Sequence, residues 1–325
     1  MSDPVLLRWE TLTKRKFDQL DRASSVVLVT CSPLEVHGPH LPFGADALEG
    51  EGLARRMLRF LPERHRARTF LELPFIYAAT DTVPQPGSIF FLPSTTQAVL
   101  RDLGRSLAAQ GFRTILVSNF HGSPRHFLAI ERACETVSRE RGVRMVCVFS
   151  VLLTRLTGGS VELYDVLGQL PGVQRDDLVG DMHGGVVETS QLLALHPEWV
   201  ERDYAELPRR TIDGWLAEQG TPAAARVEGG KARRLLATLK AAHADLRFFR
   251  AETYAGAPGA ASPELGERIL DTLAQKAAEA VTEILDGGLP PEQWHSPFWK
   301  QRFWFVNPLM VRIVNRLFGV AKGIA

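Results

Sequence analysis

The sequence predicts an α/β protein with three layers, α/β/α, built around a mostly parallel sheet. Short runs rich in β-branched residues alternate with longer segments that repeat apolar residues every three or four positions. Strands that alternate with helices form parallel sheets that are covered on both faces. Ligand sites in such sheets lie at the carboxyl ends of the strands, so the segments that follow the strands matter most for function.

Four apolar runs are the predicted strands, at residues 24–32, 67–78, 113–120 and 143–151. Three segments between them have the spacing of amphipathic helices, at residues 47–61, 94–111 and 123–141. We expect Ser94 or Thr95 to cap the second helix and Gly111 to end it.

The second half of the chain is less regular. The stretch "GDMHGGVVETSQLLALHPEWV" predicts a glycine-rich loop that opens a helix, and residues 228–246 predict a basic helix between loops. Residues 262–288 predict an amphipathic helix that Ser262 caps and Gly287 closes. We therefore expect one elaborated domain, residues 1–288, followed by a C-terminal extension, residues 289–325.

Composition excludes several classes of protein. The 325 residues carry a net charge of only +1, which gives no broad field for nucleic acid or anionic lipid. No apolar run reaches the ~18 residues of a transmembrane segment. The three cysteines form no C-x-x-C pair and the N-terminus has no signal core, so a cytoplasmic location is expected. Cys31 is either a small core residue, the favoured interpretation, or a nucleophile.

The extension is aromatic, apolar and basic, and Pro308 interrupts it. Such a segment can lie on a membrane surface. It can equally pack on the protein's own core or on a partner subunit, which is the interpretation that we favour because exposed apolar patches of this size are costly.

Metal-competent side chains follow two of the predicted strands. Glu35 and His37 are two positions apart, so an extended segment directs them to the same side. Asp46 follows a short loop rich in proline and glycine, and His121 stands at the end of the strand 113–120. Carboxylates and imidazoles suit Zn, Mn or Fe(II), singly or as a pair. The alternative is a set of structural histidines and surface acids.

Two further residues lie in the glycine-rich loop. His183 precedes two glycines that permit close approach to a ligand, and Glu188 stands at the start of the next helix, where an acid can also simply favour the helix dipole. His126, His196 and His243 lie in helical patterns and are expected to be packing or surface residues. The sequence has no P-loop, no H-E-x-x-H and no G-x-S-x-G motif.

Four segments resemble the creatininase family of metal-dependent amidohydrolases. They are "LEVHGPHLPFGAD", "SNFHGSPRH", "HGGVVETSQLLALHPEWV" and "YAGAPGAASPELGERIL", in family order over residues 25 to about 285. The resemblance implies a creatininase-like α/β/α fold, a metal centre that is commonly dinuclear and a homo-oligomer, often a hexamer. It also implies residue roles: the metal ligands would be Glu35, His37, Asp46, His121 and Glu188.

In the same resemblance Asp46 would bridge two ions, His183 would be the catalytic residue and His40 would support the ligand loop. One departure stands out. Creatininase has a Tyr and a metal-binding Glu after the strand-end His, where this chain has Gly122 and Ser123. Creatinine itself is therefore a doubtful substrate.

The sequence thus predicts a hydrolase that acts on a non-peptide C–N bond of a small cyclic amide, formamide or related amide through metal-activated water. The cofactor would be one or two divalent ions, Zn, Mn or Fe. The alternatives are a catalytically inactive creatininase-like binding or scaffold subunit, which the altered strand end motivates, and a family member that trims peptides.

Overall fold

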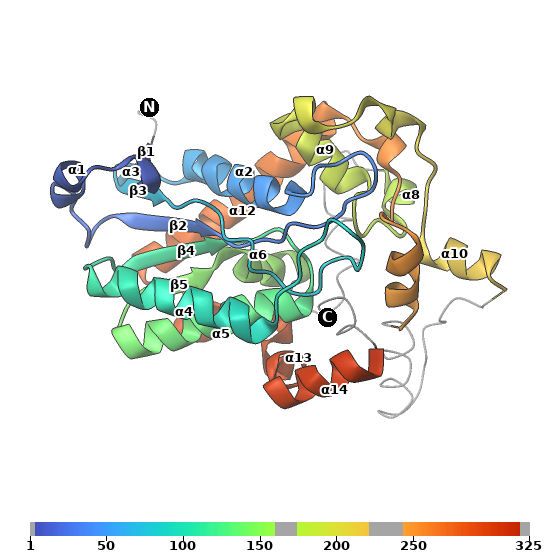
Figure 1. Cartoon of the computed structure of the whole chain (residues 1–325). Helices are drawn as coiled ribbons and strands as arrows, with labels where there is room; N and C mark the ends of the chain where they lie inside the picture. Colours follow the sequence, from blue (N-terminus) through green and yellow to red (C-terminus); the bar gives the residue numbers. More distant parts are fainter. Residues whose placement is uncertain (1–3, 160–173, 221–242, 319–325) are drawn as a thin grey trace.

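A parallel sheet forms the centre of the computed structural model, which describes residues 4–159, 174–220 and 243–318 (Figure 1). Its strand order is β1-β3-β2-β4-β5, and every neighbouring pair is parallel. The strands are Val5–Arg8 (β1), Val26–Thr30 (β2), Thr69–Glu72 (β3), Thr114–Ser118 (β4) and Arg144–Cys147 (β5). The predicted mostly parallel sheet is confirmed, while β1 was not predicted.

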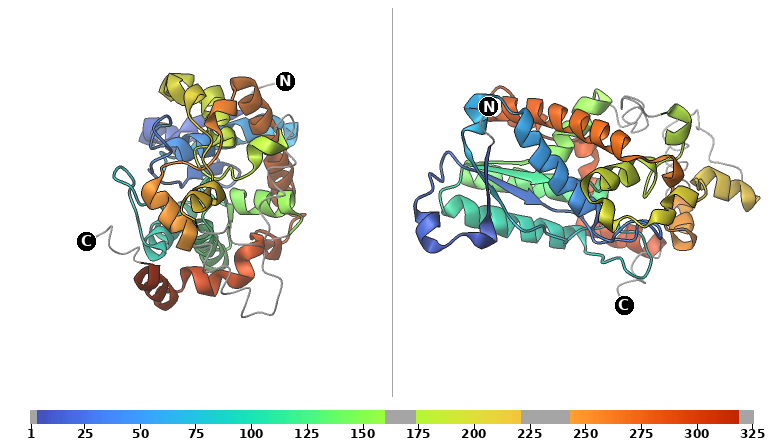
Figure 2. Two further views of the ribbon diagram at one scale, coloured as in Figure 1. Left: turned by 90° about the vertical axis from the view of Figure 1, so that its right-hand side faces the viewer. Right: turned by 90° about the horizontal axis from the view of Figure 1, so that it is seen from above.

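Helices cover both faces of the sheet. On one face lie Ala45–Phe60 (α2), Val148–Thr157 (α6) and Pro263–Asp286 (α12), with Val186–Leu195 (α9) packed on α2 and α12. Seen from above, α2 and α12 run side by side over the sheet (Figure 2). Pro93–Ala109 (α4) and Pro124–Arg141 (α5) cover the other face. The three-layer α/β/α fold is therefore confirmed.

Strand β2 shows why both faces must be covered. Val26 and Leu28 join the core beneath α2 and α12, whereas Val27 and Val29 join the core beneath α4 and α5. All five residues of the strand are buried, because successive side chains point to opposite faces and each face carries a helical layer.

Several boundaries differ from the prediction. The strand predicted at 67–78 covers only Thr69–Glu72. Residues 148–151 open α6 rather than continuing the strand 143–151, because a short buried apolar run has the same composition in a strand and in a helix. Neither Ser94 nor Thr95 caps α4: the N-cap is Leu92, and Pro93 starts the helix with its fixed φ. Gly111 follows the end of α4 with φ of +99°, as expected of a terminating glycine.

The long C-terminal helix begins and ends as predicted. The Ser262 side chain accepts a hydrogen bond from the Leu265 backbone N–H, and Gly287 ends α12 in the left-handed conformation. The predicted loop and helix of residues 180–200 appear as the approach to α9. Residues 228–242 of the predicted basic helix lie outside the described residues. Shorter helices complete the chain: Lys14–Asp18 (α1), Glu63–Arg66 (α3), Arg175–Leu178 (α8) and Ile212–Glu218 (α10).

The extension folds back beneath the layer of α4 and α5 as a 3₁₀ turn, Pro297–Gln301 (η6), and two helices, Arg302–Val306 (α13) and Pro308–Phe318 (α14) (Figure 1). Val306 is buried in a cluster with Phe127 and Leu128 of α5. Packing on the protein's own core is thus confirmed for this side of the extension. None of the helices in the described part of the chain has the length and apolar character that crossing a bilayer requires.

Candidate metal centre

The five residues that the sequence singled out as metal ligands lie together at the carboxyl edge of the sheet. Glu35 and His37 follow β2, and His121 follows β4, the neighbouring strand. Asp46 lies in the first turn of α2 and Glu188 in the first turn of α9. Glu35, His37 and Asp46 are essentially inaccessible to solvent, and His121 is nearly so.

The first set of potential ligands is Glu35, Asp46 and His121, whose donor atoms all lie within 4.8 Å of one another. His121 Nδ1 is 2.9 Å from Glu35 Oε1 and 3.7 Å from Asp46 Oδ2. The other ring nitrogen, Nε2, donates to the Thr80 carbonyl at 3.1 Å. This hydrogen bond orients the ring, so Nδ1 faces the two carboxylates.

The second set is His37, Asp46 and Glu188. His37 Nε2 lies 3.4 Å from Asp46 Oδ2 and 3.8 Å from Glu188 Oε2. His37 Nδ1 donates to the backbone carbonyl of Glu35 at 3.0 Å, which again leaves the other nitrogen facing the carboxylates. Asp46 belongs to both sets, and in both the same oxygen, Oδ2, faces the imidazole.

Unpaired buried atoms at the centre of the cluster fit a pair of divalent ions. Glu35 Oε1, His37 Nε2 and Asp46 Oδ2 are buried without a hydrogen-bond partner, an arrangement that costs free energy unless something else satisfies them. Ligand atoms bound ~2.1 Å from one ion at tetrahedral angles lie about 3.4 Å apart. The separations of 2.9 to 3.8 Å within the two sets are close to that value. Nitrogen and oxygen donors suit Zn, Mn or Fe(II).

The electrostatics of the cluster also favour a positive charge at its centre. Burial lowers the pKa of His37, but Asp46, Glu188 and Glu35 together raise it to about 10. Burial likewise opposes protonation of His121, whose pKa nevertheless rises to about 9 beside Glu35 and Asp46. Burial raises the pKa of Glu188 to about 7. In the absence of an ion, protons on the two imidazoles would neutralise the carboxylates.

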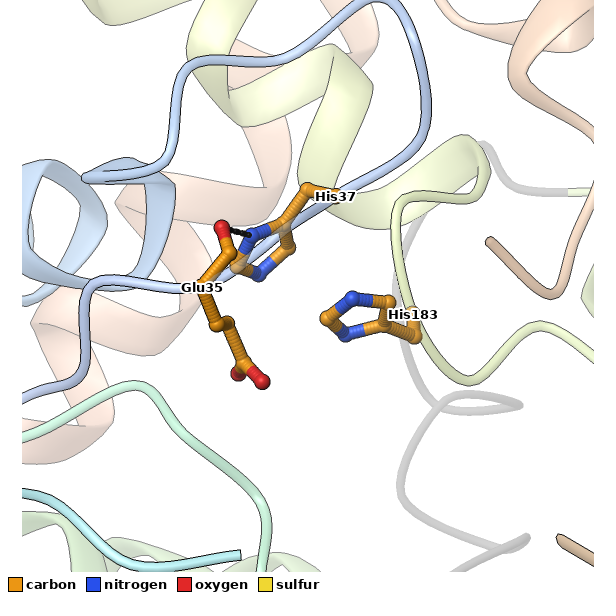
Figure 3. Close-up of side chains that lie close together, drawn as sticks. All are labelled: Glu35, His37 and His183. Atoms are coloured by element: carbon orange, nitrogen blue, oxygen red, sulfur yellow. Dashed lines mark hydrogen bonds between the residues drawn. The ribbon is translucent and has the colours of Figure 1, made fainter. Parts of the chain in front are cut away.

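His183 lies beside the two sets. Its ring stacks on that of His37 with centroids 4.1 Å apart, and one of its nitrogens lies within 4.8 Å of donor atoms of His37 and Glu35 (Figure 3). Nε2 donates to the Val36 carbonyl at 2.6 Å, so Nδ1 is the acceptor nitrogen of the neutral ring. Burial, helped by His37, lowers the pKa of His183 to about 3. A neutral His183 can accept a proton at Nδ1.

The two glycines after His183 allow the loop to pack closely on its neighbours. Gly184 has φ of +58°, and a Cβ there would lie 3.2 Å from the main chain of His37. A Cβ on Gly185 would collide with the Asp181 carboxylate, which accepts hydrogen bonds from the first backbone N–H groups of α9. The glycines therefore let the loop approach His37 and the Asp181 cap, and the expected approach to a ligand stays a prediction.

Sequence reasoning missed one acidic residue at the centre. Glu49 is fully buried on α2, one turn after Asp46, and neither of its carboxyl oxygens has a hydrogen-bond partner. Burial raises its pKa well above the ordinary range, and Glu188 and Asp46 add to the effect. The spacing of three residues within a helix was the available signal, because it places both acids on one face.

A polar network surrounds Ser123, one of the two residues that stand where creatininase has a Tyr and a metal-binding Glu. Ser123 Oγ donates to Asp81 Oδ2 at 2.9 Å, and Arg125 forms an ion pair with the same carboxylate at 2.9 Å. Arg125 also donates to Asn315 of α14 at 3.0 Å. Asp81 follows Thr80, whose carbonyl holds His121, so this network links the extension to the cluster.

The remaining candidates have structural surroundings. His40 is buried and its Nε2 lies 2.9 Å from Thr189 Oγ1 of α9. His126 is buried and donates to the Cys31 carbonyl, and His196 stacks on Trp199. Cys31 is fully buried, and burial raises the pKa of its thiol, so it is a core residue rather than an activated nucleophile.

Comparison with solved structures supports the fold. A mutant creatininase complexed with creatine is 19% identical, with a TM-score of 0.55 over 86% of this chain and 98% of that chain. A structure described as "Creatininase Mn" is 20% identical, with a TM-score of 0.53 over 86% and 98%. A mutant creatininase of "Zn-Zn type" is 20% identical, with a TM-score of 0.55 over 87% and 99%. No curated relative matches the chain.

A family model supplies the assignment that these low identities do not. The model described as "Creatininase: Creatinine amidohydrolase" matches residues 10–281, which include all the residues of the cluster and stop before the extension. The match spans most of the chain and agrees with the fold, so the chain belongs to the creatininase family.

Proposed function

We propose that this protein is a metal-dependent hydrolase that cleaves a non-peptide C–N bond in a small cyclic amide, formamide or related amide. The observation that carries the proposal is the pair of buried ligand sets that share Asp46. Each set would hold one divalent ion. The descriptions of the similar creatininase structures, which include Mn and Zn-Zn forms, support a divalent cofactor of this kind.

The chemistry requires an ion and two proton-transfer groups. A bound divalent ion lowers the pKa of a coordinated water to roughly 7 and polarises a carbonyl oxygen. Asp46 or Glu188 would accept the water proton. His183 would protonate the leaving nitrogen. Because the neutral ring donates Nε2–H to Val36, the proton would enter and leave at Nδ1, passed on from the carboxylate that accepted it from water. A pKa of about 3 means that the protonated ring would exist only briefly during this transfer.

The burial of the cluster favours a small substrate. Glu35, His37 and Asp46 are closed to solvent, and only His121, His183 and Glu188 retain some exposure. A substrate would therefore reach the centre from the side of these three residues. The Ser123–Asp81–Arg125 network presents a hydroxyl, a carboxylate and a guanidinium where creatininase would supply Tyr and Glu, which favours a substrate other than creatinine.

The cluster disfavours the alternative of an inactive binding subunit. A protein without a metal has little physical reason to keep unpaired carboxylate and imidazole atoms buried together, because each costs free energy. The expected homo-oligomer, its hexameric number and a cytoplasmic location stay predictions, as does the division of the chain at residue 289.

A screen on metal-loaded protein tests the proposal. The purified chain would be given Mn or Zn and assayed on creatinine, small lactams, hydantoins and formamides, with short modified peptides as a separate arm. We expect turnover of a small amide that chelation abolishes and metal restores, with Asp46→Asn as the inactive control. Bound metal without turnover on any compound would support the inactive subunit, and turnover of peptides alone would support a peptide-trimming member.

A further inference from the structure

The extension leaves four large apolar side chains exposed. Trp304 is 65% exposed, Leu309 60%, Phe303 51% and Ile313 42%. Leu309 and Ile313 are four positions apart on α14, so they lie on one face, while Val311 and Asn315 on the opposite face are buried against the body. We call Phe303, Trp304, Leu309 and Ile313 the outer face of the extension.

Positive charge surrounds this outer face. Lys300, Arg312 and Arg316 are exposed beside it. Residues 293–325 contain three arginines, two lysines and no aspartate or glutamate, although the whole chain has a net charge of only +1. This segment therefore has an excess of positive charge, close in sequence to the exposed apolar side chains.

We infer that the outer face binds the surface of an anionic lipid bilayer. Two short helices expose these apolar side chains, Phe303 and Trp304 on α13 and Leu309 and Ile313 on α14, close in sequence to exposed Arg and Lys. This composition is typical of segments that lie in the membrane interface. Trp304 suits the headgroup level, where an aromatic ring has apolar and polar surroundings. At 11 residues α14 is far shorter than the ~20 residues of a span, so it would lie on the bilayer.

A lipid surface fits better than a second copy of the chain. An interface between two copies related by a two-fold axis brings the same surface of each copy together. Lys300, Arg312 and Arg316 of one copy would then face those of the other, and like charges in contact oppose association. An anionic bilayer provides the complementary charge over the whole face.

Sedimentation of the full chain with vesicles tests this inference. We expect binding to mixed phosphatidylcholine and phosphatidylglycerol vesicles that weakens in high salt, with little binding to phosphatidylcholine alone. Each cation near an anionic surface contributes about fivefold to the partition coefficient, so Arg312→Gln with Arg316→Gln should weaken binding about 30-fold. The matched control is Arg15→Gln with Lys16→Gln, two exposed cations on α1 that should leave binding unchanged.

A second variant tests the apolar half of the surface. Trp304→Ser with Leu309→Ser should also reduce vesicle binding, while leaving thermal unfolding and the mass of the assembly unchanged because both side chains are exposed. Equal binding by all variants, or no binding to anionic vesicles at low salt, would overturn the inference. A change of assembly mass in the Trp304→Ser, Leu309→Ser variant would instead identify the outer face as a contact between subunits.

Discussion

Replacing Asp46 by asparagine should remove both ions, because one carboxylate oxygen serves both ligand sets. Asp46 Oδ2 lies 3.4 Å from His37 Nε2 and 3.7 Å from His121 Nδ1. Asparagine keeps the shape of the side chain but loses its charge, so each ion would lose a charged ligand. Residues that only support a ligand change metal affinity by 10–100-fold, and we therefore expect a loss of at least about 100-fold for each ion.

The assay is chelator competition followed by metal analysis of the desalted protein. We expect two ions per chain in the wild type and close to none in Asp46→Asn. Glu188→Gln is the matched control, since it removes one carboxylate charge from one set only and should leave about one ion. Loss of a single ion in Asp46→Asn, or of both ions in Glu188→Gln, would refute a shared ligand, provided that thermal unfolding shows both variants to be folded.

Three further outcomes are expected. His183→Ala should keep its metal and lose about 10²–10⁴-fold in kcat, the usual contribution of one acid–base group, and loss of metal would show that His183 is a ligand. Metal binding should release about two protons near pH 7, because His37 and His121, with pKa values of about 10 and 9, must lose theirs to bind an ion. Metal affinity should therefore rise with pH. Calorimetry in buffers of different ionisation enthalpy measures the number of protons released, and a value near zero would contradict the prediction. Glu49→Gln should stabilise the metal-free protein more at about pH 8 than at about pH 5. The raised pKa of the Glu49 carboxyl makes the folded wild type lose stability as pH increases, and glutamine does not titrate. An equal shift in Tm at both pH values would contradict this.

Much of the fold was predictable from local pattern. The buried strands β2 and β4 and the helices around them have unambiguous composition and spacing, and the capped helix α12 carries Ser262 and Gly287 at its ends. Strand β1 was missed because Val5–Arg8 is only four residues long and lies at the sheet edge, where the apolar signal is weak.

The cluster was predictable where consecutive residues carry it. Glu35, His37 and Asp46 lie within twelve positions, and the parallel topology then brings His121 to the same edge. The contacts that orient His121 and His183 were not predictable, since they involve backbone carbonyls distant in sequence. The Thr80 carbonyl accepts from His121 and the Val36 carbonyl accepts from His183. Every residue has a backbone carbonyl, so the sequence does not indicate which carbonyl a histidine will contact.

The extension illustrates a different limit. The sequence does not distinguish its buried apolar residues from its exposed ones. Val306 packs on α5, whereas Trp304, two positions earlier, is exposed. The sequence showed that residues 289–325 are aromatic, apolar and basic, but which side chains face the body depends on the surface of α5.

Anomalous diffraction from crystals grown with Zn or Mn is the most direct test of the proposed centre. We predict two peaks about 3.5–4 Å apart, one bound by Glu35 and His121, the other by His37 and Glu188, with Asp46 between them. The third group of donors, Glu35, His37 and His183, offers a single-ion arrangement instead. A lone peak coordinated by His183 would contradict both the shared Asp46 and the catalytic role of His183.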